Sequence, residues 1–119
     1  MDTKTTHALC EEALRDPQRA ITIKAIRAAL QMRSGKAWSV TGGRGTAWGW
    51  IGIEAPPRRR AQYGYMSPED QTLLGSLLGN EGPSHCQGEH IPAGDDYRRN
   101  YIERAMTGRS DIQPVCYWD

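Results

Sequence analysis

Residues with the chemistry of metal ligands and nucleophiles are concentrated in one short segment, HCQGEH. This segment places His85, Cys86, Glu89 and His90 within six residues. Zinc takes thiolate, imidazole and carboxylate ligands, so Cys86 and His90 are candidate zinc ligands. A thiol near an imidazole is also the arrangement of a cysteine nucleophile and its general base, which makes Cys86 and His90 a candidate catalytic pair.

The spacing of these residues counts against both kinds of chemistry. The chain has neither a C-x-x-C nor an H-x-x-x-H pair, so a zinc site would need Cys10 or Cys116 as a further ligand. No residue can be identified that would orient the base of the candidate pair. A polar loop is the simpler interpretation, and we expect no catalytic residue, no metal and no other cofactor.

A second segment, GGRGTAWGWIGI at residues 42–53, combines glycines with two tryptophans. Its glycines superficially resemble a dinucleotide-binding loop, but that loop lies between a strand and the N-terminus of a helix. Here the alternation from Trp48 to Ile51 predicts that a strand follows the glycines. The segment is therefore predicted to form the turn and second strand of a β-hairpin, with Gly42, Gly43 and Gly45 supplying positive φ.

The alternation of this strand separates two faces. Ile51 and Ile53 are predicted to face the core, with Trp48 and Trp50 on the opposite face, accompanied by Trp38. Exposed flat rings beside cations form a platform that binds single-stranded nucleic acid, because bases stack on the rings and phosphates contact the cations. The alternative is that the C-terminal tail, or the region after residue 80, covers the rings as a second small core.

The charge distribution favours an anionic partner. Residues 17–60 contain nine basic residues and one acid, a net charge of +8, whereas residues 1–16 carry −2 and residues 61–119 carry −5. Acidic elements that fold back onto the basic segment are the alternative explanation. The predicted nucleic-acid or partner-binding residues combine basic and aromatic side chains: Arg27, Lys36, Arg44, Trp48, Trp50, Arg58, Arg59 and Arg60.

Hydrophobic periodicity and capping signals predict the elements that position these residues. The first two expected helices cover residues 6–15 and 18–33. A third starts at Pro68 after the N-cap Ser67, and a fourth runs from Asp95 or Asp96 to Gly108. The expected strands cover residues 37–41 and 46–53, with a short third strand near 89–92. We therefore predict an α+β fold in which a two- or three-stranded antiparallel sheet, built on a central hairpin at 37–53, is covered by about four helices. Residues 1–119 are expected to form a single compact domain.

Composition narrows the cellular setting. No stretch is long and apolar enough to span a bilayer, and the N-terminus lacks the apolar core of a signal peptide. The three cysteines form an odd and sparse set, which is typical of a reducing compartment. We expect a cytoplasmic protein without a membrane partner.

The stretch from Ile23 to Pro57 resembles a small family of uncharacterised bacterial proteins. It is also distantly similar to a helix–hairpin module of large polyvalent proteins from phages and conjugative elements. The matching parts are the basic helix Ile23–Met32, the strand end Ser39-Val40, the glycine turn and the closing Pro56-Pro57. The resemblance implies a structural element rather than an activity, in a mobile-element setting where small DNA-handling and anti-defence proteins are common.

These observations predict a small, non-enzymatic protein that binds single-stranded nucleic acid, or a nucleoprotein complex, through a basic helix and a Trp/Arg hairpin. The alternative is a protein–protein inhibitor or adaptor, such as an anti-defence, anti-CRISPR-like factor. A small enzyme that uses His85, Cys86 and His90 is the third hypothesis. The sequence leaves open the choice among DNA, RNA and protein, the oligomeric state, and the exposure of Trp48 and Trp50.

Overall fold

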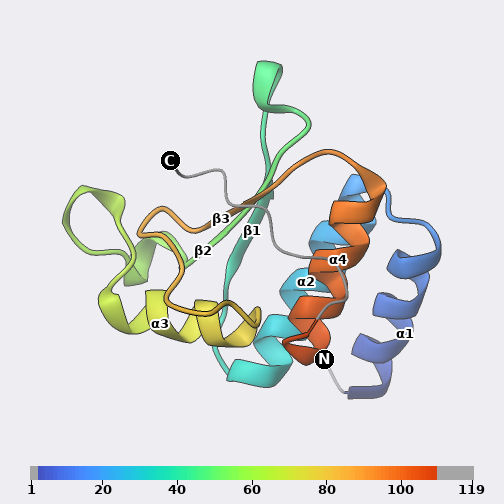
Figure 1. Ribbon diagram of the computed structural model, residues 1–119, viewed down its shortest axis with the longest axis horizontal. Helices are drawn as coiled ribbons and strands as arrows, with labels where there is room; N and C mark the ends of the chain where they lie inside the picture. Colours follow the sequence, from blue (N-terminus) through green and yellow to red (C-terminus); the bar gives the residue numbers. More distant parts are fainter. Residues whose placement is uncertain (1–2, 110–119) are drawn as a thin grey trace.

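The computed structural model describes residues 3–109, which form four α-helices and a three-stranded sheet (Figure 1). The elements in chain order are α1 (Thr3–Arg15), α2 (Arg19–Ser34), β1 (Ser39–Gly42), β2 (Ile51–Glu54), α3 (Pro68–Leu77), β3 (Glu89–Ile91) and α4 (Asp95–Thr107). This arrangement confirms the predicted α+β fold and the predicted antiparallel sheet.

The sheet has the strand order β1-β2-β3, with both pairs antiparallel. Val40 lies opposite Ile53, and Ile51 lies opposite Ile91. All four side chains are buried, so this face of the sheet forms part of the core, as predicted for Ile51 and Ile53. The period of two places Thr41, Glu54 and His90 on the other face, whereas Glu89 shares the face of Ile91.

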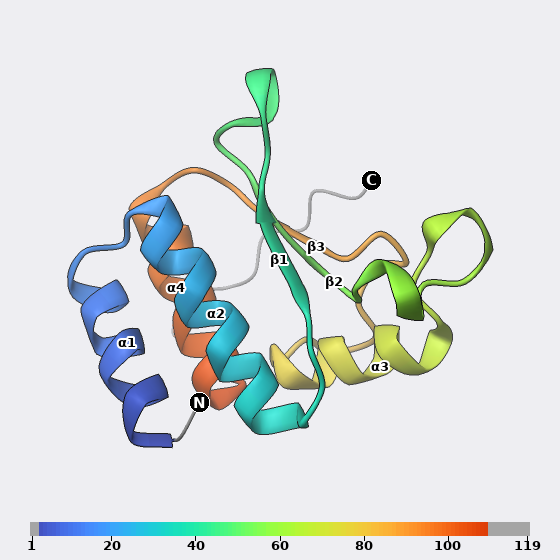
Figure 2. The ribbon, with the colours of Figure 1, turned by 180° about the vertical axis from the view of Figure 1, so that it is seen from behind.

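Figures 1 and 2 show α1, α2 and α4 packed side by side on one side of the sheet. Each helix turns an apolar stripe inward, because apolar residues recur every three or four positions. Ile26 and Leu30 of α2 and Ile102 of α4 are fully buried, and Leu74 and Leu78 extend the same core from α3. No helix formed by residues 3–109 is long and apolar enough to cross a membrane.

Local capping signals fix three helix ends, the start of α3 and the ends of α2 and α4. The Ser67 side chain accepts a hydrogen bond from the Asp70 backbone N–H (3.2 Å), and Pro68 occupies the first helical position of α3. Gly35 and Gly108 adopt left-handed conformations directly after α2 and α4, with φ of 71° and 74°.

The predicted hairpin is confirmed, but its strands are displaced from the predicted ranges. They run over Ser39–Gly42 and Ile51–Glu54 rather than over 37–41 and 46–53. Trp48 and Trp50 therefore do not share the face of a strand, and the predicted alternation of tryptophan and isoleucine faces is wrong for residues 46–50.

Residues 43–50, named here the tryptophan loop, leave the sheet and include η1 (Gly45–Ala47), a single turn of 3-10 helix. Of the three turn glycines, Gly45 alone has a positive φ, of 58°. The Arg19 side chain donates a hydrogen bond to the Trp48 carbonyl (2.6 Å). This carbonyl is held by α2, so the segment curls back toward the helix instead of extending the strand ladder.

The guanidinium of Arg33 joins three helices. Its Nη1 donates to the carbonyls of Leu77 (2.7 Å), Arg104 (3.2 Å) and Ala105 (2.7 Å). These carbonyls belong to the last turns of α3 and α4, where backbone acceptors have no partner within their own helix and the helix dipole favours a cation. Burial lowers the pKa of Arg33, but a guanidinium stays charged in proteins.

Replacement of Arg33 is therefore expected to destabilise the fold. Arg33→Ala removes the guanidinium bond to the part-buried carbonyls of Leu77 and Ala105 at two helix ends, so we expect the free energy of unfolding to fall by about 2–4 kcal/mol in urea titrations. Arg58→Ala, at an exposed position, serves as the control and should change it by less than about 0.5 kcal/mol. A loss for Arg33→Ala no larger than for the control would contradict a structural role for this guanidinium.

Candidate functional site

The His/Cys segment lies in the loop before β3 and in β3 itself. The Cys86 thiol sulfur is 3.8 Å from Nδ1 of its neighbour His85. That nitrogen already accepts a hydrogen bond from the Gln87 backbone N–H (3.0 Å), so its lone pair is engaged by the loop. Cys10 lies at the interface of α1 and α2, where its thiol donates to the Ala25 carbonyl (3.7 Å) and burial raises its pKa.

Strand alternation separates the remaining members of the segment. Glu89 lies toward α3 and α4, where Oε1 accepts hydrogen bonds from Asn80 Nδ2 (2.6 Å) and Ser84 Oγ (2.9 Å) and Oε2 lies 3.5 Å from the Tyr101 hydroxyl. The next residue, His90, extends from the opposite face of β3. Within residues 3–109, no three His, Cys, Asp or Glu side chains gather into a group that would hold a metal ion. Cys116 lies outside the described residues.

The surroundings of His90 favour the neutral form of its imidazole. Burial lowers its pKa, and this effect outweighs the opposing influence of Glu89, while His85 lowers the pKa further.

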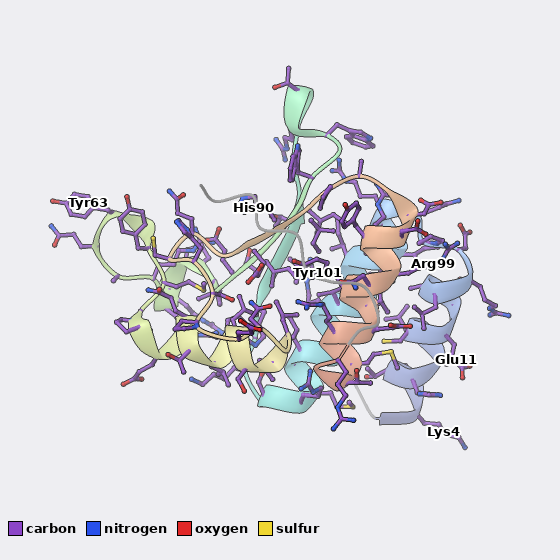
Figure 3. All side chains as sticks on the ribbon, in the orientation of Figure 1. Lys4, Glu11, Tyr63, His90, Arg99 and Tyr101 are labelled. Atoms are coloured by element: carbon purple, nitrogen blue, oxygen red, sulfur yellow. The ribbon has the colours of Figure 1, made fainter. Side chains whose placement is uncertain are left out.

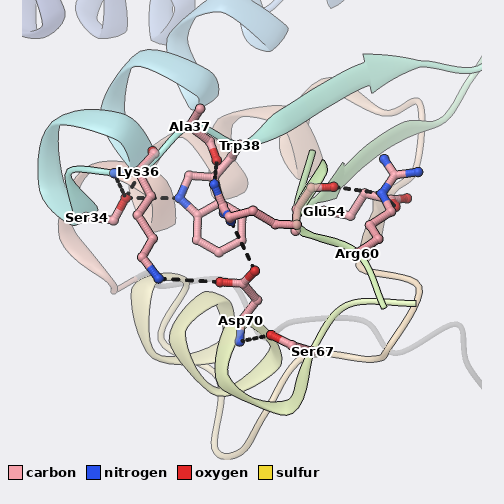
Figure 4. A network of polar contacts seen from close by, with 10 residues as sticks. Ser34, Lys36, Ala37, Trp38, Glu54, Arg60, Ser67 and Asp70 are labelled. Carbon is pink, nitrogen blue, oxygen red and sulfur yellow. Dashed lines mark hydrogen bonds and ion pairs between the residues drawn. The ribbon is translucent and has the colours of Figure 1, made fainter. Parts of the chain in front are cut away.

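A buried carboxylate holds two of the predicted binding residues in place (Figure 4). Asp70 Oδ2 accepts a hydrogen bond from Arg59 Nε (3.2 Å), and Asp70 Oδ1 lies 3.8 Å from Lys36 Nζ. Arg59 also donates to the Ala37 carbonyl (2.6 Å). The structure therefore places Arg59 in the framework, and Lys36 beside an acid that offsets its charge.

Trp38 belongs to the same network rather than to an exposed aromatic face. Its side chain is 3% exposed, its Nε1 donates to Ser34 Oγ (3.0 Å), and the Arg59 guanidinium lies 4.9 Å from its ring centroid. The predicted grouping of Trp38 with the other two tryptophans is wrong, because the ring closes the core between the end of α2 and the start of β1.

The three consecutive arginines have different environments. Arg60 Nε contacts Glu54 Oε1 (2.7 Å) and the Ala55 carbonyl (2.8 Å). Burial raises the pKa of Glu54, and the Arg60 charge acts in the opposite direction. Arg58 lies in η2 (Pro57–Arg59) and is exposed to solvent. Arg58 is therefore the member of this run that is available to a partner.

Arg27 protects the outer edge of the sheet. Its Nη2 donates to the Val40 carbonyl (2.7 Å), and Val40 lies in β1, an edge strand. A cation on an edge carbonyl blocks the pairing of a further strand. The predicted binding role of Arg27 thus competes with a structural one.

The tryptophan loop brings together the other three predicted residues. Trp48 is 64% exposed, Arg44 is exposed and Trp50 is half-buried. The loop is closed by a hydrogen bond from the Gly43 N–H to the Trp50 carbonyl (2.8 Å), and it projects from the body of the molecule in both ribbon views (Figures 1 and 2).

Arg19 completes this site, although no local sequence pattern distinguishes it from the other basic residues of 17–60. Its guanidinium carbon lies 3.6 Å from the centroid of the Trp48 ring, within the range of a cation–π interaction. On the other side the guanidinium packs against the backbone of Gly42, where a Cβ atom would overlap it. One face of the Trp48 ring is thus covered by a fixed cation, while most of the side chain remains exposed.

Comparison of this chain with protein-family models, with curated proteins and with solved structures gave no match.

The packing of Arg19 predicts the effect of a methyl group at Gly42. Gly42 does not have a positive φ, so alanine fits its backbone, but the new Cβ displaces the Arg19 guanidinium and uncovers the Trp48 ring. We expect Gly42→Ala to increase quenching of tryptophan fluorescence by iodide with little loss of stability. Gly52→Ala is the matched control, because a Cβ at Gly52 meets no atom within 4 Å. Identical quenching of the two variants would show that Arg19 does not cover the ring.

Proposed function

We propose that the protein binds single-stranded nucleic acid through the tryptophan loop and Arg19. The observation that supports this proposal best is the exposure of Trp48 in combination with the cation on one face of its ring. Exposed aromatic rings beside arginine form the stacking platforms of proteins that bind single strands without sequence preference.

The ring is held in one position before any ligand arrives. Arg19 bonds to the Trp48 carbonyl and stacks on the Trp48 ring, so main chain and side chain are tied to the same guanidinium. A ring that is ordered in the free protein loses little conformational entropy on binding, which favours affinity. A base would stack on the exposed part of the ring.

The charges around the loop suit a phosphate backbone. Residues 39–53 contain Arg44 and no acidic residue, and Arg19 adds a second cation from α2. By contrast, Lys36, Arg59 and Arg60 lie beside Asp70 or Glu54. Within residues 3–109, neither Arg19 nor Arg44 forms an ion pair with a carboxylate, so the charge beside the exposed ring is not offset in this way.

The proposal predicts which substitutions weaken binding. In fluorescence anisotropy titrations with oligothymidylate at low salt, Trp48→Ala should weaken affinity by about 1–3 kcal/mol, the contribution of one stacked base. Arg44→Ala should reduce the slope of log Kobs against log salt by about 0.7, the value for one phosphate contact on a single strand.

Lys4→Ala is the matched charge control, since Lys4 lies on α1 at the far side of the molecule (Figure 3). Equal effects of Lys4→Ala and Arg44→Ala would mean that binding depends on net charge alone and not on this site. Undetectable binding at low salt would contradict the proposal, and a protein partner retained after nuclease treatment would favour the inhibitor or adaptor hypothesis.

A further inference from the structure

A second exposed aromatic loop follows β2, at the opposite end of this strand from the tryptophan loop (Figures 1 and 2). Residues 61–65, named here the tyrosine loop, are closed by the bridge between Arg60 and Met66 and by a hydrogen bond from the Ala61 N–H to the Tyr65 carbonyl (2.7 Å). Tyr63 is 82% exposed and Tyr65 is 42% exposed. Figure 3 shows the Tyr63 side chain extending away from the body of the protein.

The backbone of the loop holds Tyr63 in an uncommon conformation. Its φ of 68° lies in the left-handed region, and it is the one non-glycine residue of the described chain with a positive φ. Packing does not account for this conformation, because the ring contact of Tyr63 is with Tyr65, at 6.5 Å between centroids. Strained residues with exposed side chains are concentrated at ligand-binding sites, where the strain fixes the side chain in a position for the ligand.

The charge of this region again suits a polyanion. Residues 55–66 contain three arginines and no acidic residue. Arg59 and Arg60 lie beside Asp70 and Glu54, which leaves Arg58 as the exposed arginine of this stretch, five residues before Tyr63 in the chain. Residues 55–66 thus combine exposed aromatic rings with an exposed arginine, Arg58, for which no ion pair is found among residues 3–109, as residues 43–50 combine Trp48 with Arg44.

The polar face of the sheet connects the two loops. Thr41, Gly52 and His90 lie in register across the three strands on this face. Thr41 is exposed, and the open space at Gly52 leaves the centre of the row without a side chain. The row itself contains no carboxylate, and Glu54, the next residue of β2 on this face, is paired with Arg60 (2.7 Å).

We infer that a single strand of nucleic acid runs from the tryptophan loop across this row to the tyrosine loop, where further bases stack on Tyr63 and Tyr65 and Arg58 contacts the backbone. This inference rests on the proposed function and extends it from one stacking position to a footprint of several nucleotides.

The test compares oligothymidylates of about 4 and about 16 nucleotides, the limits of the site sizes of small single-strand-binding folds. The wild-type protein should bind the longer one more tightly. Tyr63→Gly removes the ring and relieves the positive φ, so the variant should fold and lose roughly 5- to 100-fold in affinity for the long oligonucleotide, with unchanged affinity for the short one. Tyr63→Trp should retain affinity for both.

Gly52→Glu is an independent test of the path between the loops. The new side chain enters open space and places a negative charge on the row, so it should weaken binding of the long oligonucleotide and spare that of the short one. Gly82→Glu is its charge control, because a Cβ at Gly82 also meets no atom within 4 Å and Gly82 lies outside the row, and it should leave both affinities unchanged. Unfolding in urea checks that each variant is folded.

The outcomes separate this inference from the function on which it rests. If Trp48→Ala weakens binding of both lengths but Tyr63→Gly and Gly52→Glu change neither, the tryptophan loop binds alone and the extended footprint is wrong. Equal affinity of the wild type for the two lengths also overturns the footprint. If neither oligonucleotide binds, the proposed function and the footprint both fail.

Discussion

Hydrogen bonds from arginine guanidinium groups to backbone carbonyls hold this fold together. Arg33 closes the ends of α3 and α4, Arg27 covers the edge of β1, and Arg59 ties η2 to the segment that enters β1. Buried or edge carbonyls without partners would be costly, and a guanidinium satisfies several acceptors at once with its fixed fork of donors. The high density of arginine in residues 17–60 is thus largely a structural requirement.

This requirement determines where the protein can meet an anion. Arginines that bond to the framework, or lie against Asp70 and Glu54, are oriented inward, and their charge is partly offset. Arg19 combines both roles, because the same guanidinium fixes the Trp48 carbonyl and lies on the Trp48 ring. The exposed aromatic rings lie in loops with a solvent-exposed arginine close in the chain, Arg44 for Trp48 and Arg58 for Tyr63, and Arg19 reaches Trp48 from α2.

Parts of the fold that are set by residues close together in the sequence could be predicted, and parts that are set by contacts between distant residues could not. Helix ends were predictable where a local residue sets them, as Ser67 and Gly35 do, and the core face of β2 followed from the spacing of its isoleucines. The length of the hairpin strands could not be predicted from the sequence, because the bond from Arg19 to Trp48 joins residues 29 positions apart. Local alternation contains no information about such a contact.

The candidate binding site could likewise be predicted only as far as it depends on residues close together in the sequence. Arg44, Trp48 and Trp50 were identified from composition, and the structure places them in one loop. The acids that lie beside Lys36, Arg59 and Arg60 come from other elements, so the sequence could not separate structural arginines from available ones. No local pattern distinguishes the left-handed Tyr63 from an ordinary turn residue, apart from the glycine that follows it.

The division between structural and available arginines can be measured directly by NMR. The side-chain Nε–Hε signals of the arginines report all guanidinium groups in one spectrum, recorded during titration with oligothymidylate at low salt. The account predicts that the signals of Arg19 and Arg44 shift with the ligand while those of Arg33 and Arg59 stay in place. Uniform shifts of all four signals, or shifts confined to Arg33 and Arg59, would contradict it.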